Sequence, residues 1–396
     1  MPVEVVTPKI RGFVSLSAHP EGCAREVQRQ IEHVRRPASE WPGGNLLVVG
    51  SSAGYGLASR ITGAFGYGMD SVGVFYERPA TDNRTASAGW YNTVAFTEAA
   101  REAGLAAINL NGDAFSAAVL EEAMEAVRQI GPLDLFIYSL AAPSRTDPVS
   151  GQTYRSVLKV VGQPVTMRTA DMANGAISEA VFEAATDEEI AGTVAVMGGA
   201  DLERWVDALL AERLLAEGAR VIAYSYIGPE LTWSIYHHGT IGLAKADVER
   251  TCRRLDARLQ AEVGGRCWVS VNKSMVTQAA AAIPSVPLYI SFAYKVMKEL
   301  GVHEGTIEQT ERLFRDHIGP GRQPDLDEEG RIRIDDLELR DDVQAAIEAL
   351  WNQATSANVA ELADIDEYQE AFRRLFGFDV PGVDYDQPVE IDRPLP

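Results

Sequence analysis

The chain has 396 residues, of which 46% are hydrophobic and 23% are charged, and its formal net charge is −21. This is the composition of a globular protein that is large enough to bury a substantial core. An acidic chain repels phosphodiester backbones and anionic membrane surfaces, so we expect neither nucleic acid nor a membrane as a partner.

Targeting and disulfide signals are not apparent in the sequence. The first residues, MPVEVVTPKIRGF, lack a basic n-region and an apolar h-region, and the apolar stretch AAAAIPSVPLYISFAY is interrupted by Pro284 and Pro287. A membrane helix needs about 20 apolar residues. The cysteines, Cys23, Cys252 and Cys267, form no CxxC motif, and their odd number gives no complete disulfide set. We therefore expect a cytoplasmic protein with reduced thiols.

Short apolar runs alternate with longer amphipathic ones along most of the chain. The predicted strands lie at 45–50, 70–77, 106–110 and 133–143, with further helix-then-strand units at 204–230 and 247–274 and a strong helix at 116–131. Repeated alternation of apolar strands with helices predicts an α/β fold with a doubly wound, mostly parallel, Rossmann-type sheet.

Two regions depart from this alternation. Residues 144–203 contain polar, Thr-rich segments that predict a hairpin insertion before the next helix. Residues 303–396 are acidic and predict a helical and loop extension that packs on the core. Because no linker-like segment separates either region, we expect a single Rossmann-type domain spanning 1–396.

A glycine-rich segment, GSSAGYG at 50–56, follows the first strand and opens a helix. Gly50 can make the tight turn, Gly54 lets the backbone approach a pyrophosphate, and Gly56 allows close helix–strand packing. The helix N-terminus offers free N–H groups and a partial positive charge to a phosphate. Any glycine-rich turn could join a strand to a helix, but the strand–loop–helix context favours dinucleotide binding.

Three further segments follow strands in the order expected of a dinucleotide site. A carboxylate at Glu77 would accept both hydroxyls of an adenosine ribose and repel a 2′-phosphate, which favours NADH over NADPH. The alternative is a solvated acid at a strand end, next to Arg78. Asp113 is placed to reach an adenine, and SLAA at 139–142 is small enough to admit the nicotinamide half.

The segment TWSIYHHGTIGLAK contains Tyr236 and Lys245, a pair suited to a reductase. Residues nine apart in a regular helix are separated by about 900° and roughly 13 Å, so the two side chains would point to opposite faces. Thr240 is a plausible N-cap, and a helix that begins near Ile241 would leave Tyr236 on the preceding loop. The pair can then converge on one ligand.

The chemistry available to this pair is the stabilisation of an oxyanion. A phenol O–H can hydrogen-bond the enolate that forms when hydride reaches a carbon conjugated with a carbonyl, and a nearby ammonium lowers the phenol pKa and holds the cofactor ribose. The alternative is a buried tyrosine and a surface lysine. His237 and His238 have no third metal ligand at a useful spacing, so we expect no metal site. The sequence contains no GxSxG motif, which argues against an α/β-hydrolase.

The sequence resembles the FabV-type trans-2-enoyl-CoA and enoyl-ACP reductases, a long branch of the short-chain dehydrogenase/reductase superfamily. The resemblance covers nearly the whole chain and is carried by PKIRGF with HPEGC, GSSAGYG, SLAAP, VMGG, AYSYIGPELTWSIYHHGTIGLAK and VNKSMVTQAAAAIPSVPLYIS. The Tyr-x8-Lys spacing is the most specific of these, since ordinary members of the superfamily carry Tyr-x3-Lys and the commoner enoyl reductases Tyr-x6-Lys.

The resemblance implies NADH-dependent reduction of the C2=C3 bond of a 2-enoyl thioester by a monomeric enzyme. Tyr236 would be the catalytic donor, Lys245 the cofactor-orienting lysine, and Tyr226 the second tyrosine, which touches the thioester. The implied cofactor-binding residues are Gly50, Ser51, Ser52, Ala53, Gly54 and Tyr55 at the pyrophosphate, Tyr76 and Glu77 at the ribose, Asp113 and Ala114 at the adenine, and Leu140, Ala141, Met275, Val276 and Thr277 at the nicotinamide. The stretch 279–290 would begin the helix that walls the acyl channel.

Two other functions remain open at this point. A carbonyl-reducing or alcohol-oxidising enzyme could use the same scaffold, and a non-catalytic NAD-sensing module would bind NADH without turnover. The sequence does not distinguish CoA from carrier-protein substrates, and it does not define acyl chain length, triclosan sensitivity or the role of the acidic C-terminal extension.

Overall fold

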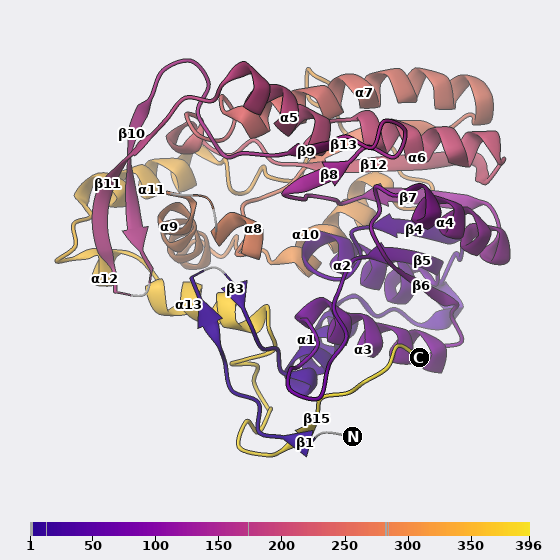
Figure 1. Ribbon diagram of the computed structural model, residues 1–396, viewed down its shortest axis with the longest axis horizontal. Helices are drawn as coiled ribbons and strands as arrows, with labels where there is room; N and C mark the ends of the chain where they lie inside the picture. The colour runs from indigo at the N-terminus through magenta and orange to yellow at the C-terminus, as the bar shows by residue number, and fades with distance from the viewer. Residues whose placement is uncertain (1–2, 13, 173, 282, 284) are drawn as a thin grey trace.

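A computed structural model describes residues 3–12, 14–172, 174–281, 283 and 285–396. Its centre is a seven-stranded sheet in which all neighbouring strands are parallel (Figure 1). In spatial order the strands are β14 (Ile332–Arg333), β13 (Arg266–Val271), β12 (Leu215–Ser225), β7 (Leu133–Tyr138), β4 (Asn45–Val49), β5 (Asp70–Phe75) and β6 (Ala107–Asn111). The predicted doubly wound parallel sheet is confirmed.

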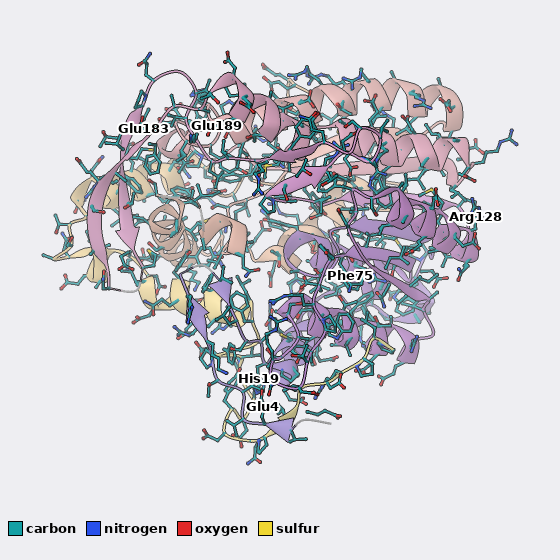
Figure 2. All side chains as sticks on the ribbon, in the orientation of Figure 1. Glu4, His19, Phe75, Arg128, Glu183 and Glu189 are labelled. Carbon is teal, nitrogen blue, oxygen red and sulfur yellow. The ribbon has the colours of Figure 1, made fainter. Side chains whose placement is uncertain are left out.

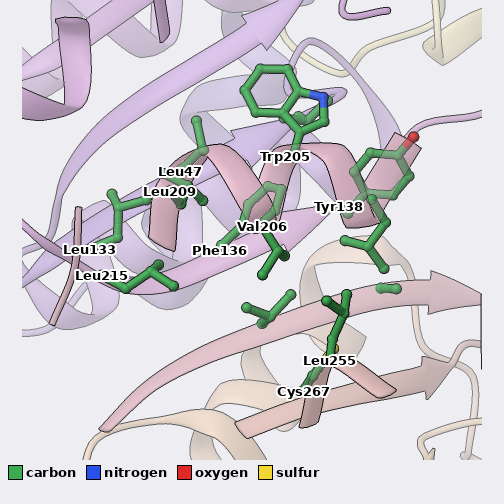
Figure 3. Close-up of a cluster of buried hydrophobic side chains, with 14 of the residues drawn as sticks. Leu47, Leu133, Phe136, Tyr138, Trp205, Val206, Leu209, Leu215, Leu255 and Cys267 are labelled. Atoms are coloured by element: carbon green, nitrogen blue, oxygen red, sulfur yellow. The ribbon is translucent and has the colours of Figure 1, made fainter. Parts of the chain in front are cut away.

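Helices cover both faces of this sheet because its strands are apolar on both sides. One face packs against α4 (Ala117–Ile130), α6 (Ala200–Ala211) and α7 (Thr240–Val263). The other faces α1 (Pro20–Val34), α2 (Gly54–Ile61), α3 (Ala88–Glu102) and α10 (Thr306–Leu313). Figure 3 shows the first cluster, in which the Trp205 ring of α6 lies 6.3 Å from that of Phe136 in β7. Such buried aromatic pairs contribute about 1 kcal/mol beyond their buried area.

The direction in which the strands are wound reverses at one point of the sheet. From β4 the chain proceeds outward through β5 and β6, then returns to the other side of β4 with β7 and continues outward through β12 and β13. The carboxyl ends of β4 and β7 therefore flank the point where the winding reverses. In open α/β sheets ligands bind at this position.

Residues 144–203 form two antiparallel hairpins and a helix. The hairpins are β8 (Ser144–Thr146) with β9 (Thr153–Arg155), and β10 (Val165–Asp171) with β11 (Ala176–Phe182), and α5 (Asp187–Met197) follows. The second hairpin stands at the edge of the molecule beside α9 (Val286–Glu299) (Figure 1). Figure 2 shows Glu183, just after it, at this outer edge, whereas Phe75 lies in the interior.

The C-terminal region is joined to the main sheet, a feature that the sequence did not predict. Its strand β14 pairs in parallel with β13, and Ile332 and Ile334 are fully buried there. Beyond it, α11 (Asp341–Gln353), α12 (Val359–Leu362) and α13 (Ile365–Arg374) build a second apolar core around α9. The last strand, β15 (Val389–Glu390), pairs with β1 (Val3–Glu4), so the two ends of the chain meet (Figure 1).

The remaining elements are short. They are β2 (Ile10–Arg11), β3 (Val14–Ser15), η1 (Ala38–Glu40), η2 (Thr62–Gly66), η3 (Glu230–Thr232), α8 (Gln278–Ala281) and η4 (Phe314–Ile318). Within the part of the chain that the structure describes, no helix has both the length and the apolar character needed to cross a membrane.

Candidate active site

The predicted site segments all follow the carboxyl ends of strands in the parallel sheet. The segments after β4, β5, β6 and β7 hold the predicted pyrophosphate, ribose, adenine and nicotinamide positions, and those after β12 and β13 hold Tyr226 and the 275–277 loop. Because carboxyl ends of parallel strands share one edge, the fold gathers residues that are more than 200 positions apart in sequence.

The glycine-rich loop is tightly packed against the end of β7. Gly50 has φ of +88°, and a Cβ built there would lie 2.1 Å from the Ser139 carbonyl oxygen. A Cβ at Gly56 would lie 1.9 Å from the carbonyl oxygen of Gly50 itself. These two positions exclude a side chain, as the dinucleotide loop requires. Gly54 has φ of +54° and faces open space, which leaves room for a ligand at the start of α2.

Glu77 is tied to the same loop. It lies two residues beyond the end of β5, where Ser52 Oγ donates a 2.8 Å hydrogen bond to its Oε1. The backbone N–H of Glu77 donates to Asn111 Oδ1 at 2.8 Å. A Cβ at Gly89 would lie 2.1 Å from Glu77 Oε1, so α3 can approach the carboxylate only because that residue is glycine. The acid is thus held in place at the edge of the glycine-rich loop and is not a freely solvated side chain.

The other predicted cofactor residues differ in exposure. Tyr76 is 80% exposed, and Asp113 and Ala141 are also exposed, so their surfaces are open to a ligand. Ala114 is buried, with its carbonyl accepting from Arg204, and Leu140 is half-buried against the main core. Ser51 and Ser52 are buried and Ala53 is exposed.

Tyr226 and Tyr236 meet edge to face. Their ring centroids lie 4.7 Å apart at an interplanar angle of 81°. Burial raises the pKa of both phenols well above the usual value, so both remain protonated at neutral pH. The hydroxyls of Ser274 and Thr232 are near Tyr226 and oppose the rise, but the geometry gives Tyr226 Oη no hydrogen-bond partner among the described residues. A buried unpartnered O–H costs roughly 1–3 kcal/mol, and a ligand oxygen would satisfy it.

The helix that carries Lys245 begins after Tyr236, so the two residues are not nine positions apart within one regular helix. α7 starts at Thr240 with Gly239 as its N-cap, one residue before the cap that the sequence suggested. Tyr236 therefore lies on the preceding loop, and its carbonyl accepts from the backbone N–H of Gly242 at 3.0 Å. Lys245 sits in the second turn, as predicted.

One expectation about this pair is wrong. We expected the Lys245 ammonium to lower the pKa of Tyr236, but burial raises it and no charged neighbour opposes the rise. Lys245 Nζ instead donates to the carbonyl oxygen of Tyr224 at 3.0 Å, and no hydrogen bond between described residues joins it to Tyr236. Burial lowers the pKa of Lys245 itself to about 8. Burial is thus the largest influence on the pKa of both groups.

The loop after β13 contains polar groups that the sequence analysis overlooked. Met275 and Val276 are buried there, and Thr277 is half-buried. Lys273 and Ser274 belong to this loop and are nearly fully buried. The fully buried Gln309 and Glu338 hydrogen-bond to them, and Tyr289 donates to Glu338. The polar run NKS directly after a buried strand was the available signal for the first two; nothing in the sequence distinguished Glu338 from the other acids around it.

The predicted acyl-channel segment is described in part. Within 279–290, α8 ends at Ala281 and α9 begins at Val286, while Ala282 and Pro284 lie outside the described residues. Ala280, Ala281 and Tyr236 pack against the same apolar cluster, around the buried face of α9. The described part of the apolar segment and Tyr236 therefore contact the same apolar cluster.

Comparisons with known proteins match the whole length of the chain. Family models described as the NAD(P)H binding domain and the catalytic region of trans-2-enoyl-CoA reductase match residues 5–82 and 84–318. A Clostridium trans-2-enoyl-CoA reductase in complex with NADH is 41% identical with a TM-score of 0.95, covering 99% of this chain and all of the other. The Treponema denticola trans-2-enoyl-CoA reductase in complex with NAD is 46% identical with a TM-score of 0.93, at the same coverage.

A curated relative points the same way. The enoyl-[acyl-carrier-protein] reductase [NADH] of Opitutus terrae is 52% identical over 99% of this chain and 100% of its own. A third family model, described as an enoyl reductase FAD binding domain, matches residues 326–389.

The described residues of 326–389 do not fit a flavin. The glycines of this segment lie in turns: Gly330 and Gly382 face open space, and Gly377 packs against the backbone of α1. None of them joins a strand to a helix N-terminus, where a dinucleotide pyrophosphate binds. Inward polar groups such as Glu338 and Gln344 are already hydrogen-bonded to protein. The strand–glycine loop–helix unit that suits a dinucleotide is the one at 45–61, with Glu77 at its edge. With the family models and relatives above, these features establish that the chain belongs to the trans-2-enoyl-CoA reductase family.

Proposed function

We propose that this protein uses NADH to reduce the C2=C3 double bond of trans-2-enoyl thioesters to the saturated acyl thioesters, a step of fatty acid synthesis. The observation that carries the proposal is the edge-to-face contact of Tyr226 and Tyr236, two protonated phenols that follow β12 on the sheet edge where the glycine-rich loop follows β4. The relatives named above, acting on enoyl-CoA and enoyl-carrier-protein substrates, support the substrate class.

The reaction needs one hydride and one proton. NADH, when bound, supplies the hydride to C3, and the electron pair of the double bond moves onto the thioester carbonyl oxygen to form an enolate. Tyr236 is placed to donate a hydrogen bond to this oxygen, and Tyr226 to contact the thioester group. Because burial keeps both phenols protonated, each can act as a donor at neutral pH. A proton from solvent then adds at C2, and the enolate collapses to the saturated thioester.

The cofactor roles follow the same edge of the sheet. Gly50 to Tyr55 would hold the pyrophosphate, Tyr76 and Glu77 the adenosine ribose, and Asp113 with Ala114 the adenine. Leu140, Ala141 and the loop Met275, Val276 and Thr277 would flank the nicotinamide. Lys245, whose Nζ donates to the Tyr224 carbonyl oxygen at 3.0 Å, would turn to the ribose hydroxyls when the cofactor binds.

We expect Glu77 to determine the preference for NADH. Replacing it with alanine removes the charge that repels a 2′-phosphate and the acceptor for the ribose hydroxyls. The ratio of kcat/KM for NADH to that for NADPH should fall by about tenfold or more, because each interaction with a charged group is worth about 1.5–3 kcal/mol. Steady-state kinetics with both cofactors measures the ratio. Arg78→Ala, at the neighbouring position, should not lower the ratio, because a guanidinium near the ribose attracts a 2′-phosphate and its loss can only disfavour NADPH.

NADH binding should weaken above pH 8. Lys245 is charged below its lowered pKa of about 8 and neutral above it, and NADH binds better to the charged form. The Kd for NADH should therefore be constant below pH 8 and rise by at most about tenfold per pH unit above it. Nucleotide fluorescence titrations from pH 6.5 to 9.5 measure this. Burial lowers the pKa of Lys273 to about 8 as well, so a break that persists in Lys245→Arg would assign the effect to another group.

The proposal is tested against ketone reduction by offering crotonyl-CoA and acetoacetyl-CoA in parallel and following NADH absorbance. We expect NADH to be oxidised with the enoyl thioester and not with the ketone. NADH oxidation with the ketone alone would favour the carbonyl-reductase alternative. Tight NADH binding without turnover of any enoyl-CoA or enoyl-carrier-protein would favour the NAD-sensing alternative. Comparing the same acyl chain on CoA and on a carrier protein decides the carrier.

We also propose that the whole chain acts as one monomeric, cytoplasmic domain of this reductase type. The pairing of β14 with β13 supports this, because the C-terminal region completes the same sheet that carries the cofactor loop. Light scattering of the purified protein at micromolar concentration should give the mass of a single chain, and a dimer mass would contradict this.

A further inference from the structure

The loop Lys273–Thr277 leaves the sheet at the end of β13, and side chains hold its backbone in place. The backbone N–H of Lys273 donates to Gln309 Oε1 at 3.1 Å, and its carbonyl accepts from Tyr55 Oη at 3.0 Å. The N–H of Val276 donates to Tyr294 Oη at 3.2 Å. The N–H groups of Met275 and Thr277 have no hydrogen bond to a described residue, which leaves amide donors on this loop for a ligand.

Gln309 joins this loop to the glycine-rich loop. Its Oε1 accepts from Tyr55 Oη at 2.7 Å as well as from Lys273, and its Nε2 donates to the Ile334 carbonyl oxygen at 2.6 Å. One fully buried amide of α10 therefore contacts both proposed cofactor loops and the strand segment that follows β14.

Glu338 holds the centre of the loop. It comes from the segment between β14 and α11 and is fully buried. Its Oε2 accepts from the backbone N–H of Ser274 at 2.9 Å, and its Oε1 accepts from Ser274 Oγ at 2.5 Å and Tyr289 Oη at 2.8 Å. Gln344 Nε2 in turn donates to the Glu338 carbonyl at 2.6 Å and fixes its backbone.

A fully buried carboxylate is unfavourable unless donors and an opposite charge compensate for lost hydration. Burial raises the pKa of Glu338, and the buried Lys273 ammonium is the largest influence that opposes the rise. That ammonium donates to the Ser274 carbonyl oxygen at 2.9 Å, so both polar backbone groups of Ser274 are held by charged side chains. Ser274 Oγ lies beside Tyr226, which connects the carboxylate to the proposed catalytic pair.

We propose that Glu338 is a positioning residue of this reductase. Through Ser274 it holds the loop Met275–Thr277 in the conformation that receives the nicotinamide, and it sets the Ser274 hydroxyl against Tyr226. The C-terminal segment, which the sequence did not connect with the active site, thereby forms part of the NADH site. This inference rests on the proposed function for its kinetic consequences, but its effect on NADH binding can be measured separately.

The test compares Glu338→Ala, Glu338→Gln and the matched control Asp335→Asn. Asp335 is also a buried carboxylate on the same segment, but it pairs with Arg333, and no hydrogen bond joins its side chain to a described residue of the loop. We expect Glu338→Ala to raise the Kd and KM for NADH about tenfold or more, as for loss of a charged hydrogen bond, with a smaller change in the KM for crotonyl-CoA. In Glu338→Gln the amide oxygen still accepts from the Ser274 N–H, so its Kd should lie between those of wild type and Glu338→Ala.

Thermal unfolding separates positioning from general stability. Asp335→Asn should lower the melting temperature about as much as the Glu338 substitutions do, and it should leave the Kd for NADH within about twofold of the wild-type value. An unchanged Kd in the folded Glu338 variants, or an equal rise in Asp335→Asn, would overturn the proposal; if Glu338→Ala does not fold, Glu338→Gln decides. If the wild-type protein turns over no enoyl thioester, the proposed function is refuted. If the Glu338 variants of that protein still bind NADH more weakly than wild type does, the positioning role is supported.

Discussion

Replacing Tyr236 with phenylalanine is expected to lower kcat for crotonyl-CoA by about 10²–10³-fold, the cost of removing one oxyanion donor. Only the hydroxyl is lost, since the ring still packs 4.7 Å from that of Tyr226 and against the apolar cluster around α9. NADH affinity should change little because Tyr236 is proposed to contact the substrate oxygen. The measurement is steady-state NADH oxidation at 340 nm together with a fluorescence titration of NADH.

The control for this variant is Tyr154→Phe. The Tyr154 hydroxyl donates to Gln152 at 3.1 Å on the β8–β9 hairpin, so the control removes the same atom from a tyrosine that is not among the proposed site residues. It should retain nearly full kcat. Tyr226→Phe should also have a lower kcat, because the unpartnered hydroxyl of Tyr226 is proposed to contact the thioester. A Tyr236→Phe enzyme that keeps more than a third of wild-type kcat would refute the catalytic role of this phenol.

Gly50→Ala is expected to abolish NADH binding and to destabilise the fold by about 2–5 kcal/mol. The added Cβ would lie 2.1 Å from the Ser139 carbonyl oxygen, and the backbone has φ of +88°. Overpacking costs about 1–3 kcal/mol, and a left-handed conformation without glycine adds roughly 1–2 kcal/mol. The loop can relieve the overlap only by moving away from the end of β7, and this movement would displace the proposed pyrophosphate site.

Gly104→Ala isolates the backbone contribution. Gly104 has φ of +77° at the end of α3, and its Cβ would meet nothing within 4 Å. This variant should lose only about 1–2 kcal/mol of unfolding free energy and bind NADH normally. Chemical denaturation and NADH titration of both variants provide the comparison. Equal destabilisation by the two substitutions, with NADH binding intact in both, would show that the contact with Ser139 is unimportant.

The sequence predicted those features that depend on local chemistry. The apolar strand, the glycines at 50 and 56 and the helix that follows are determined by neighbouring residues, and the structure places them as expected. The late start of α7 was also predictable, because the residues before Thr240 are poor helix formers. These predictions required only propensities and spacing within a few residues.

Features that depend on distant contacts were not predictable in this way. β14 is two residues long, and it becomes a strand only because β13 presents a free edge to it. Glu338 looks like its acidic neighbours in PDLDEEGRIRIDDLELRDD until the fold buries it against Ser274. The pKa of Tyr236 was predicted in the wrong direction, because the extent of burial is a property of the packed structure and not of the Tyr-x8-Lys spacing.

The most direct test of the proposed reaction uses NADH deuterated at both C4 positions with crotonyl-CoA in ordinary water. Mass spectrometry and NMR of the product should find butyryl-CoA with one deuterium at C3 and a solvent proton at C2. This result requires hydride transfer to the conjugated carbon and protonation of an enolate. Recovery of unreduced crotonyl-CoA, or a product with deuterium on the carbonyl-derived carbon and the double bond intact, would contradict enoyl reduction.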